Sequence, residues 1–171
     1  MATVKFLNAA GKYDDPSARH NVINYICQRT KTPSGLIIGC PMAPAVAAAE
    51  MQSVAQNFHK DNKVRIRHFV IALYKGELPS LTHIDAMAED ICRELGQTYQ
   101  IICALHEDTQ IPHIHFVFNP VSYVNGSKYS GTRAEHRGLM DLLWRVVSRH
   151  GIRTFYEIKY RPESADQHEL D

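Results

Sequence analysis

The chain is poor in cysteine, has no long hydrophobic run and carries almost no net charge. Its four cysteines are spread along 171 residues without a C-x-x-C pair, which excludes a disulfide framework and a cysteine zinc site as its organising feature. No apolar run approaches the roughly 20 residues of a membrane span, and the first residues lack the layout of a signal peptide. We therefore expect a cytoplasmic protein with no membrane association.

Two familiar hydrolase motifs are also missing. The chain has no G-x-S-x-G nucleophile elbow and no H-E-x-x-H helix. The net charge of +1 argues weakly against nucleic-acid binding, although cations outnumber acids between residues 126 and 161 and an acidic tail follows. The composition is that of an ordinary globular protein. We expect one domain over residues 1–161 and a tail over residues 162–171, either disordered or the start of a linker.

Hydrophobic periodicity predicts an α+β fold. Alternating residues indicate strands at 3–8, 64–74, 99–106, 114–120 and 154–160, whereas helical spacing indicates helices near 16–29, 44–59, 82–96 and 132–151. Thr82 with Asp85 and Thr132 with Glu135 have the spacing of capping boxes. Residues 36–40 are apolar but too few to assign. The order of elements predicts a central antiparallel sheet flanked by helices, with a hairpin at its centre.

The most informative segment holds three histidines within ten residues: His106, His113 and His115. They lie on the two strands of the predicted hairpin, joined by the short loop 107–112. If His106 pairs with His113, Ala104 lies opposite His115 and all three imidazoles share one face. A shift of one residue would scatter them. The pattern predicts a divalent-metal site with positions open to a substrate.

An acidic residue beside this cluster would complete it. We expect Asp108, with Glu107 as the alternative, to hold one imidazole in a fixed tautomer by a hydrogen bond. The nucleophile is harder to find from the residues alone. Tyr25 lies on the first predicted helix among core residues and is followed by a polar segment with two cations. On pattern alone it is most simply a core aromatic residue.

Several motifs together resemble the nuclease domain of the relaxase, or mobilisation nuclease, family within the HUH endonuclease superfamily. His113-Ile114-His115 matches the His-hydrophobic-His motif, and His106-x-Asp108 matches the motif before it. Asn24-Tyr25-Ile26 resembles the first motif, whose tyrosine is the nucleophile. The segments 67–77 and 119–129 also resemble relaxases. Ala72 departs from the family, which often has serine there and uses it near the DNA backbone.

The resemblance implies a fold, a cofactor and a reaction. The fold is the HUH palm, an RRM-like antiparallel sheet with the metal site on its central hairpin. The resemblance assigns His106, His113 and His115 to a divalent metal, with Mg²⁺ or Mn²⁺ expected first and Zn²⁺, Ni²⁺ or Co²⁺ as alternatives. It assigns Tyr25 as the nucleophile, with Tyr13 in reserve. The phenol proton is expected to go to Asp108 or His68.

The implied substrate is single-stranded DNA at the transfer origin of a plasmid or integrative element, nicked during conjugative mobilisation. Candidates for phosphate contacts are Arg65, Arg67, Lys128 and Arg133. Tyr123 and Tyr129 are candidates for stacking on bases. The expected partners are accessory relaxosome proteins and a coupling protein.

Three other interpretations stay open. A rolling-circle initiator or a transposase of the same superfamily would place its nucleophile after the histidine strand, at Tyr156 or Tyr160. A metal hydrolase that uses water would form no covalent adduct with DNA. A non-catalytic RRM-like binding module would expose aromatic residues such as Phe116 and Phe118 on its sheet.

Overall fold

The computed structural model describes residues 2–7, 12–74 and 80–156, and it confirms the α+β class. The strands are β1 Ala2–Leu7, β2 Ile37–Cys40, β3 Arg67–Leu73, β4 Ile101–His106, β5 His113–Phe118 and β6 Thr154–Tyr156. The helices are α1 Ala18–Ile26, α2 Ala47–Asn57, α3 Leu81–Leu95 and α4 Arg133–Arg149, and a 3-10 turn, η1, spans Pro44–Val46. The expected boundary at residue 161 and the acidic tail lie outside the described residues.

The strands form one sheet in the order β2-β4-β5-β3-β1-β6. Every neighbouring pair is antiparallel except β1 with β6, which is parallel. The β4–β5 hairpin therefore lies in the interior of the sheet, between β2 and β3, as the sequence predicts. Because it has neighbours on both sides, its register is held by two sets of backbone hydrogen bonds.

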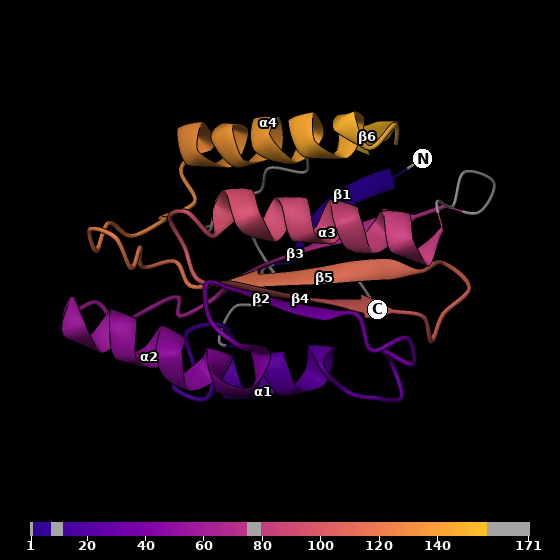
Figure 1. The fold of residues 1–171 in the computed structure, drawn as a ribbon. Helices are drawn as coiled ribbons and strands as arrows, with labels where there is room; N and C mark the ends of the chain where they lie inside the picture. The colour runs from indigo at the N-terminus through magenta and orange to yellow at the C-terminus, as the bar shows by residue number, and fades with distance from the viewer. Residues whose placement is uncertain (1, 8–11, 75–79, 157–171) are drawn as a thin grey trace, which may run out of the picture.

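Helices cover both faces of the sheet (Figure 1). On one side α3 and α4 bury a core with Phe69, Phe116 and Phe118, and on the other side α1 and α2 bury a second core with Ile102 and Val117. Phe116 and Phe118 are fully buried, so the exposed aromatic face required by an RRM-like binding module is absent at these positions. Within the described part of the chain, no helix has the length and apolarity needed to cross a membrane.

The sequence predicts the start of one helix, α4, correctly, and the starts of α3 and α1 differ from the prediction. Thr132 and Glu135 form the predicted capping box at the start of α4. The cap of α3 is Ser80, whose hydroxyl accepts the amide proton of His83, and not Thr82. The first helix begins at Ala18 instead of Pro16, because the carboxylate of Asp15 accepts the amide proton of Ser17 and holds a turn there.

Candidate metal centre

The three histidines predicted as metal ligands come together where the β4–β5 hairpin meets its loop. His106 pairs with His113 and Ala104 pairs with His115, which is the predicted register. One ring nitrogen of each histidine lies within 4.8 Å of those of the other two.

Two of the imidazoles use their second ring nitrogen to bind the backbone. His106 Nε2 donates to the carbonyl oxygen of Ile26 at 2.9 Å, and His113 Nδ1 donates to that of Ile111 at 3.0 Å. A carbonyl oxygen only accepts, so each bond places the ring proton on that nitrogen. The other nitrogen then carries a lone pair. Metal-binding histidines are ordinarily fixed in this way by an outer partner.

His115 provides the strongest sign that the cluster fits a metal. Its Nδ1 lies 2.8 Å from Nε2 of His68, whereas its Nε2 is buried and has no hydrogen-bond partner among the described residues. A buried polar nitrogen without a partner is costly. A divalent metal at the cluster would satisfy this nitrogen, so the donor set fits such an ion.

Burial favours the neutral form of His68, His106 and His115. The loss of solvent on burial lowers the pKa of His115 to about 2 and that of His68 to about 4, and it also lowers the pKa of His106. The imidazoles around the cluster add to this shift in His115, because their positive charges would repel one another. Neutral imidazole is the form that binds a metal.

Tyr25 lies beside this cluster at the end of α1. Its ring centroid is 5.7 Å from that of His106 and 6.0 Å from that of His115. The side chain is 44% exposed, so the prediction from pattern alone that it is a core residue is wrong. The helix buries its neighbours Ile23 and Ile26 instead, which leaves Tyr25 on the solvent side of the histidines.

Tyr13, the reserve nucleophile, has the opposite environment. It is 6% exposed and its hydroxyl lies 2.8 Å from Nδ1 of His68. Burial raises its pKa to about 12. A buried phenol that keeps its proton is poorly suited to attack an incoming phosphate.

Lys31 is a residue of the site to which the sequence assigns no role. Its ammonium lies 5.1 Å from the centroid of the Tyr25 ring and 2.8 Å from Oδ2 of Asp108. Asp108 thus pairs with Lys31, and the described hydrogen bonds of the imidazoles go to other groups. The hydrogen bond from Lys31 lowers the pKa of Asp108. The alternative acid, Glu107, accepts the amide proton of Ser34.

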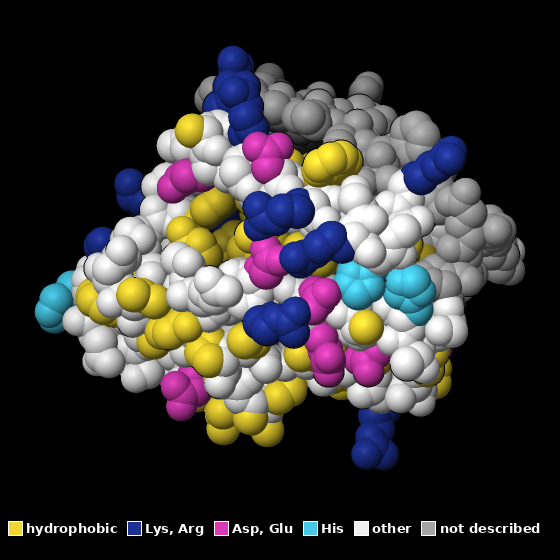
Figure 2. Space-filling view, turned by 45° about the horizontal axis from the view of Figure 1, so that its top comes forward, with side chains coloured by type: hydrophobic (Ala, Val, Ile, Leu, Met, Phe, Trp, Pro, Cys, Tyr) yellow, Lys and Arg dark blue, Asp and Glu magenta, His cyan; other side chains and the backbone are white. Residues whose placement is uncertain are grey.

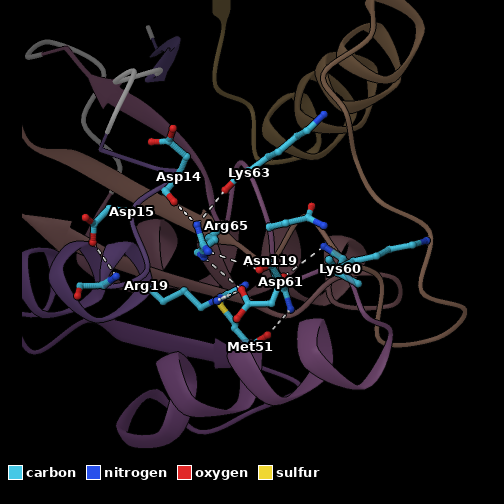
Figure 3. Close-up of polar contacts among 12 residues, drawn as sticks. Asp14, Asp15, Arg19, Met51, Lys60, Asp61, Lys63, Arg65 and Asn119 are labelled. Atoms are coloured by element: carbon cyan, nitrogen blue, oxygen red, sulfur yellow. Dashed lines mark hydrogen bonds and ion pairs between the residues drawn. The ribbon is translucent and has the colours of Figure 1, made fainter.

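Two of the four predicted DNA-binding cations are engaged inside the protein. Arg65 donates to the carbonyl oxygens of Asp14 and Lys63 and pairs with Asp61, as Figure 3 shows. Lys128 donates to the carbonyl oxygen of Asn62 at 2.6 Å. Loss of solvent is the main cause that lowers the pKa of Lys128. These contacts give both residues a structural role in the absence of DNA.

Of the other DNA-binding candidates, Arg67 lies far from the hairpin loop. Arg67 pairs with Phe118, five residues along β3 from the partner of His113, or about 16 Å at 3.3 Å per residue. Its guanidinium lies over the ring of Tyr129. Tyr129 is 7% exposed, so it is a core aromatic residue and does not offer a face for base stacking. Arg133 begins α4 and is exposed.

On the face over α3 and α4, cations and acids alternate (Figure 2). Glu94 pairs with Arg145 and Arg149, and Asp90 pairs with Arg93 and His150. A patch of one sign, which would attract a DNA backbone, is therefore not present in this region of the described surface.

Comparison with known proteins agrees with this geometry. A model of the family "Relaxase: MobA/VirD2-like, nuclease domain" matches residues 25–152. The matched segment begins at Tyr25 and includes all three histidines and Asp108. Since it covers most of the chain, the chain belongs to this family of relaxase nuclease domains, which are DNA nickases.

A particular relative is Protein TraI of Escherichia coli. The two chains are 28% identical over 110 residues, which make up 64% of this chain and 15% of TraI. The matched segment therefore corresponds to a small part of TraI.

Proposed function

We propose that this domain nicks single-stranded DNA at the transfer origin of a mobile element, with Tyr25 as the nucleophile and a 5′-phosphotyrosine as the intermediate. The observation that carries the proposal is the position of Tyr25, exposed and next to two histidines of a cluster that fits a divalent metal. A phenol there can reach a phosphate that the same cluster holds.

The reaction exchanges one phosphodiester bond for another. The Tyr25 oxygen forms a bond to phosphorus, the bond from phosphorus to the 3′ oxygen breaks, and the 3′ oxygen leaves with a proton as a hydroxyl. The number of phosphodiester bonds is unchanged, so no nucleotide triphosphate is needed and the strand can be resealed. The phenol proton must go to a base as the bond forms.

Residues around Tyr25 have three further roles: to bind the metal, to accept the phenol proton and to stabilise negative charge on the phenol oxygen. His106, His113 and His115 would hold the expected Mg²⁺ or Mn²⁺, which would supply positive charge to neutralise the phosphate. Asp108 receives the phenol proton, but its lowered pKa makes it a weak base. The ammonium of Lys31 lies over the Tyr25 ring, where its positive charge would stabilise the negative charge that develops on the phenol oxygen.

The proposed substrate follows from the need for in-line attack, because a phosphate within a regular duplex is not accessible to a tyrosine beside a buried cluster. We propose that the DNA is single-stranded at the nick. Arg133 is the proposed phosphate contact that the structure leaves exposed, whereas Arg65, Arg67 and Lys128 would act at a distance from the cluster. Accessory relaxosome proteins and a coupling protein remain the proposed partners, and the cytoplasm the proposed location.

A cleavage assay tests the proposal. Labelled single-stranded oligonucleotides that carry candidate transfer origins are incubated with Mn²⁺ or Mg²⁺, and the products are separated on denaturing gels. Wild type is compared with Tyr25→Phe, with His113→Ala and with Tyr13→Phe, which removes the hydroxyl of the reserve nucleophile. We expect a slowly migrating protein–DNA adduct in wild type, and in Tyr13→Phe when the metal is saturating, and none in the other two.

Two results would overturn the assignment of Tyr25. Cleavage without an adduct would indicate attack by water. An adduct that survives in Tyr25→Phe would indicate another tyrosine, as in rolling-circle initiators. In the sheet, β6, the strand that includes Tyr156, is separated from β5 by β3 and β1.

A further inference from the structure

A line of three buried side chains extends behind the metal centre, away from solvent. His115 Nδ1 lies 2.8 Å from His68 Nε2, and His68 Nδ1 lies 2.8 Å from the hydroxyl of Tyr13. All three side chains are at most 6% exposed. The residues come from β5, from β3 and from the segment before α1, so only the folded chain brings them together.

The direction of these hydrogen bonds is set by what His115 must do. If its Nε2 binds a metal, that nitrogen carries the lone pair and the proton is on Nδ1. Nδ1–H then donates to Nε2 of His68, which leaves the proton of His68 on Nδ1. That proton donates to the hydroxyl oxygen of Tyr13, so Tyr13 is the final acceptor of the line.

We propose that His68 and Tyr13 are positioning residues that hold His115 in the tautomer whose Nε2 faces the metal. The inference rests on the proposed metal site and adds residues behind its ligands. His68 acts on His115 as the carbonyl oxygens of Ile26 and Ile111 act on His106 and His113. Every ligand of the cluster then has an outer partner.

The opposite direction is unfavourable in this structure. If Tyr13 donated to His68 and His68 donated to His115, the remaining proton of His115 would be on Nε2. That nitrogen is buried with no acceptor among the described residues. A buried donor without an acceptor is destabilising, and the same proton would block the metal. A bound metal would satisfy Nε2 only in the first arrangement, in which that nitrogen carries the lone pair.

Four variants separate positioning from packing. His68→Leu removes the acceptor, whereas His68→Gln retains an amide oxygen that can accept from His115. Tyr13→Phe removes only the outer hydroxyl. His136→Leu is the matched control, because His136 packs against Phe6 on the opposite face of the sheet. Zn²⁺ and Mn²⁺ affinities are measured by calorimetry, and thermal unfolding without metal reports folding.

We expect His68→Leu to weaken Zn²⁺ binding by about ten- to a hundredfold, the usual effect of losing an outer partner. Tyr13→Phe should weaken it less, His68→Gln should restore part of the loss, and His136→Leu should bind as wild type does. In the Zn²⁺-bound wild type, nitrogen NMR of the rings should show protons on Nδ1 of both His115 and His68.

Affinities of His68→Leu and Tyr13→Phe equal to that of the control, or coordination through Nδ1 of His115, would overturn the inference. If His68→Leu does not fold, His68→Gln and Tyr13→Phe decide the question by the same criteria. Wild type that binds neither metal would refute the metal centre and this inference together. Metal binding that depends on His68, without DNA cleavage, would refute only the proposed function.

Discussion

The rings of Tyr25 and His106 meet edge to face with their centroids 5.7 Å apart. A backbone hydrogen bond reinforces this contact, because His106 donates to the carbonyl oxygen of Ile26, the residue after Tyr25. One histidine thus contributes to the metal cluster and also fixes the end of the helix that carries the proposed nucleophile. The distance from the tyrosine to the cluster is therefore set by a bond between α1 and β4, and not by a flexible loop.

Lys31 should affect the chemical step more than metal binding. Replacing it in Lys31→Met removes the charge over the Tyr25 ring, and we expect the single-turnover rate of adduct formation to fall by about tenfold, equivalent to about 1.4 kcal/mol. Lys31→Arg should retain most of the rate. Asp108→Asn should also lower it, because the neutral amide holds Lys31 less strongly and does not take up a proton.

Calorimetry with Mn²⁺ is the control for these variants, since none of them removes a histidine. Unchanged affinity with a lowered rate would locate the effect at Tyr25. A wild-type rate in Lys31→Met would show that its charge is not used.

Arg65 should matter for folding before it matters for DNA. We expect Arg65→Met to lower the free energy of unfolding by about 1 to 2 kcal/mol, because it removes the pairing with Asp61 and the bonds to two carbonyl oxygens. Urea denaturation measures this effect. Lys63→Met removes the same charge from an exposed position nearby and should change stability little; equal losses in both variants would contradict the structural role of Arg65.

Acid should destabilise the metal-free protein through its buried histidines. Burial lowers the pKa of His68 from 6.5 to about 4, so between these values the unfolded chain binds a proton that the folded protein does not. The free energy of unfolding must then fall as pH falls through this window, by about 3 kcal/mol for His68 alone.

Urea denaturation at pH 7 and pH 4.5, with a chelator present, measures the acid effect. His68→Gln does not titrate and should show a smaller loss between the two pH values. A loss as large as that of wild type would assign the acid sensitivity to other groups.

The structure and the sequence pattern assign different residues as the N-cap of α3: Ser80 in the structure and Thr82 in the pattern. Ser80→Ala removes the hydroxyl that accepts from the amide of His83 and should cost about 1 kcal/mol. Thr82→Ala, at the position that the sequence pattern indicates, should cost less because Thr82 lies inside the helix. Thermal unfolding of both variants compares them, and a larger cost for Thr82→Ala would favour the pattern.

Much of the site could be predicted from the sequence because the hairpin is local. The loop between the two strands is short, so the alternation of His106, Ala104, His113 and His115 fixes both register and face. Local alternation does not predict the exposure of Tyr25, because that exposure depends on which side of α1 packs against the sheet. Residues 36–40 could not be assigned for a similar reason, since β2 is defined by its pairing with β4.

The predicted DNA contacts show that local sequence patterns do not reveal whether a side chain is available to bind a ligand. Arg65 and Lys128 were predicted to bind DNA because they are positively charged. In the structure both donate hydrogen bonds to carbonyl oxygens of segments distant in sequence. Tyr129 looked available for stacking and is instead packed beside Tyr99 and Phe118. A side chain's availability to a ligand depends on which other segments surround it.

The sequence by itself determined the class of fold, the three histidines and their shared face, because strand alternation and a short loop act over neighbouring residues. Only the tertiary structure decided which tyrosine faces the cluster, that Lys31 holds Asp108 beside it, and that Tyr13 and His68 stand behind His115. These relations join residues 55 and 77 positions apart. They arise when helices and strands pack on one another, and no local periodicity encodes them.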